Sequence, residues 1–275
     1  MHVSPTAASR FESGVVKSAG LAAIAAAALV CPLHVIAQER PGDEESSSWG
    51  LGFGAVTKQL PYRGFDRENK ALPLIQFENK YVKVFGPGVE VKLPGMQISE
   101  AQRLNFSLVG QFDLSGYKAS DSVYLAGMAE RKGGFWIGGK AEWATSVADV
   151  TAEWTGDASG NSKGQKFSLG IERSWQLGQN VMLTPRLVAN WHDAKYVDYY
   201  YGVRAGEARA GRAAYRGDSA ISTELGVRGL YRFDKQHAMF VDVGVTSLGS
   251  KIKDSPLVDR SSESKVFVGY MYRFR

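Results

Sequence analysis

The amino-acid sequence predicts an all-β fold: a transmembrane, antiparallel, up-and-down β-barrel of about twelve strands, with short periplasmic turns and longer extracellular loops. Three observations lead to this class. The chain begins with a segment typical of exported proteins, no later apolar run approaches the ~18 residues that a spanning helix needs, and apolar and polar residues alternate in segments of about ten residues. Because lipid offers the backbone no hydrogen bonds, only helices and closed barrels cross it.

The composition agrees with this class. The 275 residues include 31 Gly, and 11% of them are aromatic while 22% are charged. This mixture is too polar for a bundle of membrane helices, and it is rich in residues that favour strands and turns. The formal net charge of +5 is spread along the chain without a basic cluster, so it does not predict nucleic-acid binding.

Residues 1–37 are predicted to form a cleaved signal peptide for Sec export. A basic start is followed by an apolar run, and Val35 and Ala37 suit the positions before a signal peptidase site, so cleavage is expected after Ala37. The only cysteine, Cys31, lies in this segment. A lipoprotein would carry its lipid on this cysteine, but Val30 stands where a small residue is expected.

The mature chain is therefore expected to consist of a short N-terminal segment, residues 38–47, and the barrel, residues 48–275. It contains no cysteine after export, which excludes a disulfide framework and thiol chemistry.

The first half of the barrel is predicted from six alternating segments. In the segment 49–57, for example, Trp49, Leu51 and Phe53 lie on one face and three glycines lie on the other. Residues 80–93 are taken as one strand, with a bulge at residues 86–88 that changes its facing. The expected strands are 49–57, 72–79, 80–93, 103–114, 135–143 and 147–154.

The second half alternates more regularly, although Arg173 interrupts one apolar row. The expected strands are 166–175, 181–191, 221–233, 239–245 and 265–274. Both ends of the chain should lie on the periplasmic side, which requires an even number of strands. Residues 122–131 are therefore the expected twelfth strand, although they also fit a short helix; ten strands is the alternative count.

The connections sort by length. Residues 176–180 and 234–237 are predicted to be tight periplasmic turns. The predicted external loops are 58–70, 94–102, 193–218 and 249–263.

A soluble β-sandwich would show the same alternation, with its apolar rows facing a core. Aromatic residues at segment ends favour a membrane barrel, because such barrels carry aromatic girdles at both interfaces. The residues concerned are Trp49, Trp143, Trp154, Trp175, Trp191, Phe233 and Phe274.

The sequence predicts no enzyme, cofactor or metal site. The mature chain has two histidines, His192 and His237, and no metal-binding or nucleophile motif. The polar rows predict a cross-paired interior network, with a charge-lined pore as the alternative. They contain Lys140, Glu142, Glu172, Arg186, Glu224, Arg228 and Arg232. Four arginines in the loop 194–218 either touch lipopolysaccharide phosphates or belong to a loop folded into the barrel mouth.

Several stretches resemble the MipA/OmpV family of Gram-negative outer-membrane proteins. They are "LPYRGFDRENKALPLIQFENKYVKV" from residue 60, "YYYGV" from residue 199 and "DSPLVDRSSESKVFVGYMYRF" from residue 254. The residues that carry the resemblance are Tyr62, Gly64, Pro73, Tyr81, Tyr201, Gly202, Tyr215, Ser255, Pro256, Leu257, Tyr272 and Phe274.

This resemblance implies location in the cell outer membrane, in contact with its lipid and lipopolysaccharide. It also implies a scaffold that links a lytic transglycosylase with a penicillin-binding protein in peptidoglycan synthesis, while other members are described as antigens or adhesins. A small-solute channel is the alternative function. No catalytic residues come with the family. The aromatic ending Tyr270, Tyr272 and Phe274 resembles the signal that the barrel assembly machinery recognises, and Arg275 departs from that signal.

Overall fold

The computed structural model describes residues 47–113 and 115–274. The predicted signal peptide (1–37), its cleavage after Ala37, most of the segment 38–47 and Arg275 lie outside the described residues. Within the described ranges no helix is long and apolar enough to span a membrane.

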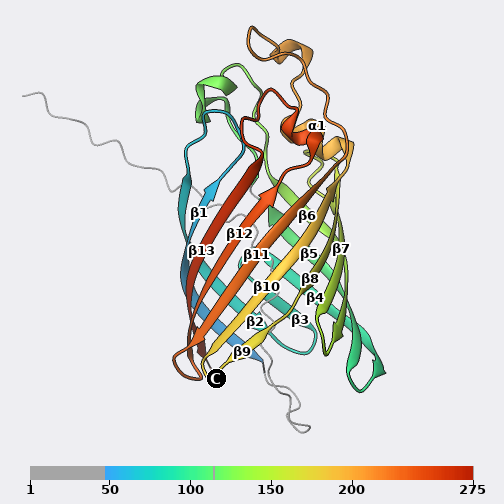
Figure 1. Cartoon of the computed structure of the whole chain (residues 1–275), viewed down its shortest axis with the longest axis vertical. Coiled ribbons are helices and arrows are strands. Elements are labelled where there is room, and N and C mark those ends of the chain that lie inside the picture. The colour runs from blue at the N-terminus through green and yellow to red at the C-terminus, as the bar shows by residue number, and fades with distance from the viewer. Residues whose placement is uncertain (1–46, 114, 275) are drawn as a thin grey trace, which may run out of the picture.

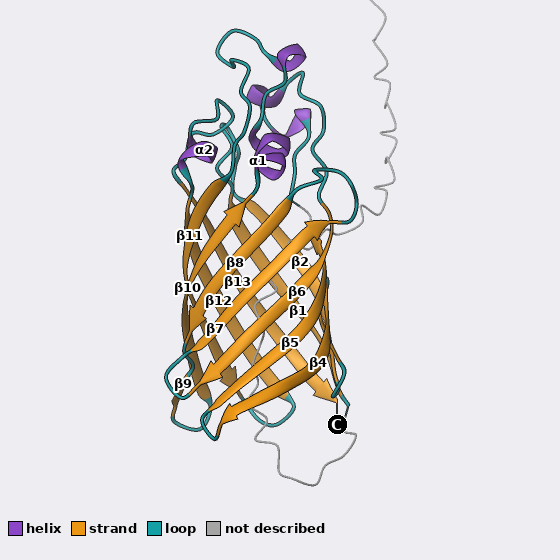
Figure 2. Cartoon of the chain, turned by 90° about the vertical axis from the view of Figure 1, so that its right-hand side faces the viewer, coloured by secondary structure: helices purple, strands orange, loops and turns teal. Residues whose placement is uncertain are grey.

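The described chain forms one closed antiparallel barrel capped by loops at one end (Figure 1 and Figure 2). Consecutive strands are neighbours around the wall, and β13 pairs with β1 to close it. The strands are β1 (Ser48–Gln59), β2 (Glu68–Glu78), β3 (Val82–Phe85), β4 (Gly88–Ser99), β5 (Gln102–Asp113), β6 (Gly134–Thr145), β7 (Asp149–Asp157), β8 (Gln165–Glu172), β9 (Trp175–Leu177), β10 (Val181–His192), β11 (Ala220–Arg232), β12 (His237–Ser247) and β13 (Ser262–Phe274).

The segments β8 and β9 are two parts of one strand, so the wall has twelve strands, as predicted. Both pair with β10 in the same register. Between them, the Arg173 N–H donates to the carbonyl of Pro185 at 3.3 Å, but Pro185 has no N–H to donate in return. The interrupted apolar row at Arg173 therefore coincides with a local loss of pairing.

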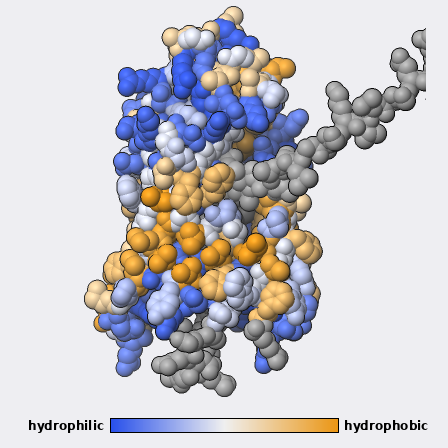
Figure 3. Space-filling view, turned by 180° about the vertical axis from the view of Figure 1, so that it is seen from behind, coloured by the Kyte–Doolittle hydropathy of each residue, from blue (hydrophilic) through white to orange (hydrophobic). Residues whose placement is uncertain are grey.

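The outward row of each strand is apolar and exposed, as lipid requires. Leu51 and Phe53 of β1 are 51% and 67% exposed, and Leu225 of β11 is 64% exposed. Figure 3, which shows the opposite face of the barrel, displays an apolar band between a hydrophilic loop end and a hydrophilic turn end. A soluble sandwich would bury these residues, so the membrane-barrel prediction is confirmed.

The predicted single strand 80–93 is wrong: it is the hairpin of β3 and β4. Gly86 has a φ of +54° and Pro87 follows it, and Phe85 pairs with Gly88 across them. A positive φ at the first central residue with proline at the second suits a two-residue hairpin turn. The residues 86–88 therefore reverse the chain instead of bulging it.

Two further segments differ from the prediction. Residues 122–131 are not a strand, because they lie in the long loop between β5 and β6, where residues Val123–Leu125 form a short 3-10 turn, η2. Residues 94–102 are not an external loop, because β4 continues to Ser99 and turns directly into β5 at the turn end. The even strand number comes from β3 instead.

The half of the lumen nearer the turn end is filled by apolar side chains, which we call the apolar plug. The plug was not predicted from the sequence. Phe240 and Phe267 pack with ring centroids 5.3 Å apart, and both are at most 5% exposed. Burying each such side chain contributes about 1.5–3 kcal/mol relative to exposure. The plug consists of Val56, Leu72, Leu74, Met182, Leu230, Ala238, Phe240, Phe267 and Met271, with Phe85 against it.

Buried ion pairs adjoin the plug, as the network interpretation predicts. Arg186 binds Asp242 at 2.7 Å and Glu224 at 2.7 Å, and Arg228 lies 3.5 Å from Asp242. Gly226 leaves space for the Arg186 guanidinium, since a Cβ there would lie 2.5 Å from its Cζ. Across the lumen Lys140 binds Glu90 at 2.7 Å.

Candidate functional site: the loop cap and the cavity beneath it

The loops at one end of the barrel fold into a compact layer, which we call the loop cap (Figure 2). It contains α1 (Ala194–Tyr201), α2 (Ser250–Lys253) and three 3-10 turns: η1 (Ala119–Asp121), η2, and η3 (Ala205–Glu207). Its buried core is Tyr62, Phe65, Tyr117, Leu125, Met128, Trp136, Tyr196, Val197, Tyr200, Tyr201, Val203, Ala220, Leu248, Ile252, Leu257 and Val258. A core of this size makes the cap a packed unit that closes the mouth.

Helix α1 is fixed at both ends by local sequence. The Asp193 carboxylate accepts a hydrogen bond from the Tyr196 N–H at 2.8 Å, which caps the first turn. The N–H of Gly202 donates to the Asp198 carbonyl at 2.9 Å, and a Cβ on Gly202 would lie 2.2 Å from that oxygen. Glycine is therefore required where the chain leaves the helix.

Four of the predicted family positions meet at the centre of the cap. The Tyr62 hydroxyl donates to the Tyr200 carbonyl at 3.2 Å, and its ring stacks on Tyr201 at 5.5 Å. The Ser255 hydroxyl donates to the Tyr201 carbonyl at 2.6 Å, and the Leu257 N–H donates to the Ser255 hydroxyl at 3.2 Å. These contacts join the loops that follow β1, β10 and β12.

Three more predicted positions lie at the edges of this core. Gly64 has a φ of +71° and a Cβ there would lie 2.7 Å from the Ser122 hydroxyl, so glycine permits the close approach of two loops. The Tyr215 hydroxyl donates to the Lys251 carbonyl at 2.6 Å. Pro256 lies between Ser255 and Leu257 in the same turn.

The remaining predicted positions lie away from the cap. Pro73 is on the outer face of β2, and Tyr81 is in the turn between β2 and β3. Tyr270, Tyr272 and Phe274 lie on β13 near the turn end, where Phe274 pairs with Trp49. The predicted set therefore covers at least three separate regions of the barrel.

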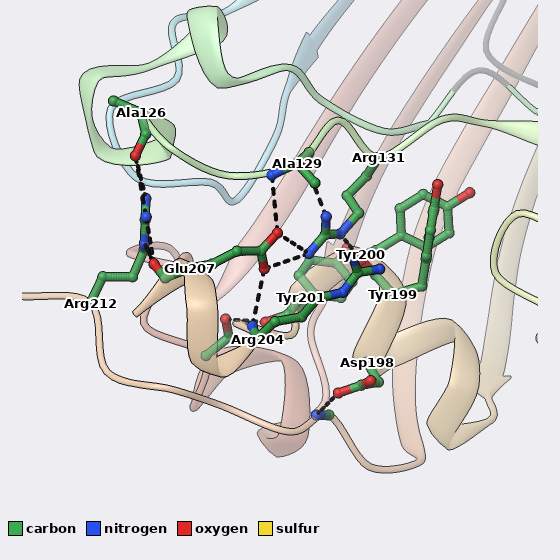
Figure 4. A network of polar contacts seen from close by, with 12 residues as sticks. Ala126, Ala129, Arg131, Asp198, Tyr199, Tyr200, Tyr201, Arg204, Glu207 and Arg212 are labelled. Carbon is green, nitrogen blue, oxygen red and sulfur yellow. Dashed lines mark hydrogen bonds and ion pairs between the residues drawn. The ribbon is translucent and has the colours of Figure 1, made fainter. Parts of the chain in front are cut away.

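The ion pair of Arg131 with Glu207 joins two further loops (Figure 4). The Arg131 Nη2 lies 2.8 Å from Glu207 Oε2, and both side chains are at most 8% exposed. Burial by itself raises the pKa of Glu207, but hydrogen bonds from Arg131 and from the N–H groups of Ala129 and Arg204 outweigh it and hold this pKa at about 2. The carboxylate is thus charged at any physiological pH.

Arg212 and Arg209 bind backbone carbonyls of the cap. Arg212 Nη1 donates to the Tyr124 carbonyl at 2.5 Å. Its Nε donates to the Glu207 carbonyl at 3.0 Å, and its Nη1 lies 3.2 Å from the Ala126 carbonyl (Figure 4). Arg209 Nη2 donates to the Val123 carbonyl at 2.8 Å. These two arginines therefore fit the interpretation of a loop folded into the barrel mouth. Val123 and Tyr124 lie more than 80 residues away in sequence from the arginines that bind their carbonyls, so no local pattern could reveal these two contacts.

A polar cavity of about 340 Å³ lies between the loop cap and the ion pairs. Such a volume is at the lower end of small-ligand pockets. Its wall carries charges of both signs, with Lys166 bound to Asp113 at 3.3 Å and Lys70 bound to Glu68 at 2.9 Å. The other charged lining residues are Lys58, Glu153 and Glu263.

The two histidines lie in different parts of the barrel. His192 lines the cavity and stacks on Tyr196 with ring centroids 4.4 Å apart, while Asp193 caps α1 and does not orient the imidazole. His237 contacts Tyr270 at the turn end. In residues 47–113 and 115–274, no group of three or more His, Cys, Asp or Glu side chains is placed to hold a metal ion.

Comparison with known proteins gives relatives along the whole barrel. The chain is 27% identical over 245 residues to the outer membrane protein YiaT of Escherichia coli (strain K12), which covers 83% of this chain and 92% of that protein. It is 25% identical over 234 residues to the MltA-interacting protein of the same strain, covering 84% and 91%. It is 28% identical over 158 residues to OmpV of Vibrio cholerae, covering 58% and 61%.

Among solved structures, an outer membrane channel from Pseudomonas putida F1 is similar with a TM-score of 0.44 and 14% identity, covering 86% of this chain and all of that one. The model of the family described as "MltA-interacting protein MipA" matches residues 51–274. These residues include the whole loop cap and every strand of the closed barrel except the first three residues of β1. The chain therefore belongs to the MltA-interacting protein MipA family and is a β-barrel of the cell outer membrane.

Proposed function

We propose that the protein is a non-enzymatic platform in the outer membrane that binds peptidoglycan-remodelling enzymes from the periplasmic side. The name of one relative, the MltA-interacting protein, supports a lytic transglycosylase as one partner. A penicillin-binding protein is the second proposed partner. On this proposal the cap closes the extracellular mouth, and the partner enzymes bind at the turn end.

The observation that carries the proposal is the hairpin formed by β4 and β5, which projects from the turn end (Figure 1). All nine residues from 93 to 101 are exposed. Met96 and Ile98 are 54% and 53% exposed. They lie in the end of the hairpin that extends beyond the partner strand β3. Turns at this end of bacterial barrels face the periplasm, so an apolar hairpin here offers a surface to periplasmic proteins.

The test is co-purification after cross-linking in intact envelopes. The double variant Met96→Ser/Ile98→Ser should lose most of the captured transglycosylase or synthase, because it removes the apolar contact and keeps the hairpin. Val147→Ser is the matched control, since Val147 is 66% exposed in another turn at the same end. If the unmodified protein captures no cell-wall enzyme, or if both variants capture it equally, the proposal fails.

A small-solute channel is the second candidate, and the polar cavity favours it. Charged side chains on several strands surround this cavity, as they do in selective pores. The apolar plug argues against conduction, because ions cannot cross a packed apolar layer. Planar-bilayer recordings of the purified barrel separate the candidates: steady conductance above background would favour the channel.

A further inference from the structure

The barrel wall is incomplete between β2 and β5 towards the loop end, and we call this gap the notch. Strand β3 has four residues and pairs with β2 only from Gln76 to Glu78. On this side of β2, no strand of the described chain pairs with the edge from Glu68 to Leu74. The tip of the β3–β4 hairpin, at residues 86–87, forms the floor of the notch.

Pro73 identifies this edge in the sequence itself. The Gly86 N–H donates to the Ile75 carbonyl at 3.0 Å, so the backbone polar groups of Ile75 point towards β3. Alternate residues of a strand point these groups to the same side, which places the nitrogen of Pro73 on the unpaired edge beyond the end of β3. Proline lacks the N–H that a neighbouring strand would need, and it is confined in sheets to such edges.

The notch opens within the apolar band and not at the polar rim. Ala71, Pro73 and Ile75 point outwards on β2 and are exposed. Their register partners on β1 are Ala55, Phe53 and Leu51, which are exposed apolar residues as well. Lipid chains therefore surround the outer side of the gap.

The polar cavity lies directly behind the notch. Glu68 and Lys70 of β2 and Gln111 and Asp113 of β5, the strands on either side, all line it. The side chains of Lys70 and Glu68 point inwards and yet remain 40% and 34% exposed, whereas Arg186 in the closed wall is 3% exposed. The cap closes the cavity above and the plug closes it below, so the notch is its lateral mouth.

The cavity wall carries a pair of lysines on one side and, on the other side, Glu153, whose register partner is Lys140 of β6. Lys58 and Lys265 are directly opposite each other on β1 and β13, and like charges in this arrangement repel. Lys265 lines a recess of about 140 Å³ that shares Lys58 and Glu263 with the cavity. Among residues 47–113 and 115–274, neither lysine has a salt bridge within 4.0 Å, and neither does Glu153 on the other side of the cavity.

We propose that the notch admits a zwitterionic phospholipid from the bilayer. Its phosphate lies between Lys58 and Lys265, its ammonium group faces Glu153, and its acyl chains stay on the outer apolar surface beside Phe53 and Pro73. A soluble solute has no need of a mouth that opens into lipid, whereas an amphiphile matches an apolar approach and a charged interior. This lipid-binding activity goes beyond the platform role and does not depend on it.

Access through the notch is tested with single cysteines, because the only native cysteine, Cys31, lies in the predicted signal peptide. A bimane label is placed at Lys70→Cys beside the notch, at Ser168→Cys in the cavity on β8, which is paired on both sides, and at Phe53→Cys on the outer surface. Phospholipids with a nitroxide near the head group should quench labels 70 and 168, because the head group enters the cavity that both residues line. Phospholipids with a nitroxide near the end of an acyl chain should quench label 53 and leave label 168 bright. A label at position 168 that stays bright with the head-group nitroxide would overturn the proposal.

Head-group recognition is tested by native mass spectrometry of the barrel extracted from phosphatidylethanolamine vesicles. Lys58→Gln/Lys265→Gln should retain at least tenfold less lipid than the unmodified protein, while Lys235→Gln, in a turn at the other end, should retain the same amount. Equal retention in the double variant would refute the proposed anion site.

Two further experiments distinguish the proposed phospholipid from other occupants of the cavity. Soluble glycerophosphoethanolamine carries the head group without chains and should not displace the lipid; full displacement would make the cavity a solute site and overturn the proposal. A variant without residues 38–46 should bind lipid as the full chain does. Binding that appears only after this deletion would mean that the chain's own segment occupies the cavity, which also overturns it.

Discussion

At the scale of single residues, two glycines on β11 test how tightly the interior is packed. A Cβ on Gly226 would meet the Arg186 guanidinium at 2.5 Å, whereas a Cβ on Gly229 would meet nothing within 4 Å. Since Arg186 is held by Asp242 and Glu224, it cannot move aside without loss of those pairs. Gly226→Ala should therefore destabilise the barrel by about 1–3 kcal/mol, and Gly229→Ala should change little. Urea unfolding in lipid vesicles measures both, and equal effects would contradict the packing argument.

Glu207 gives the loop cap a defined acid sensitivity. Its pKa is lowered from 4.5 to about 2, so its contribution to stability is complete above pH 4.5, declines below it and disappears as the pH falls through about 2. Glu207→Gln should loosen the cap at neutral pH and remove this transition. Hydrogen exchange of the cap backbone, measured from pH 7 to pH 2 (about the range of this titration), checks both. A variant with the same acid transition would show that another group causes it.

At the scale of elements, we expect the last strand to affect assembly. Phe274 pairs with Trp49 at the closure of the barrel, and its aromatic side chain lies near the chain end. Phe274→Ala should reduce the amount of barrel in the outer membrane, and deletion of Arg275 should preserve or increase it, because the terminal carboxylate would then follow the aromatic residue directly. Quantitative blotting of outer-membrane fractions measures both. A lower yield after deletion of Arg275 would contradict this expectation.

Strands with a local alternating pattern were predicted correctly from the sequence. The predictions were wrong where pairing between strands determines whether a segment is one strand, two strands or a loop. Alternation identified the segments that became β1, β5 to β8 and β10 to β13, since each exposes one row to lipid. It could not separate β3 from β4, because Gly86 reverses the chain within a run that keeps alternating. Residues 122–131 alternate weakly, which suggested a strand. In the structure they contribute Leu125 and Met128 to the core of the loop cap.

The site was partly predictable for the same reason. The family resemblance identified Tyr62, Tyr201 and Ser255 without the contacts that unite them. The apolar plug had a visible signal, since around Leu72 and Leu74 both rows of β2 are apolar. A strand that is apolar on both faces must be buried on the inner one. Arg131 and Glu207 had no such signal, because their contact joins distant loops.

At the scale of the whole molecule, the loop cap and the apolar plug are two seals in series. Opening one seal should leave ion conductance at background, because the other still blocks the path. The plug variant is Phe240→Ala/Phe267→Ala, and the cap variant is Tyr62→Ala/Tyr201→Ala. Only the fourfold variant should show conductance steps in a planar bilayer. Conductance in either double variant alone would mean that its remaining seal does not close the lumen.

The closure of the barrel by β1 and β13 also sets the order of folding. Residues 49–59 pair one by one with residues 274–264, so the first strand of the wall waits for the last. Such long-range contacts form slowly, because the intervening loop must close before they stabilise anything. The barrel wall therefore cannot close before the final residues are present. Until then the chain is exposed to aggregation, and holdase chaperones that delay aggregation should raise the yield of the finished barrel.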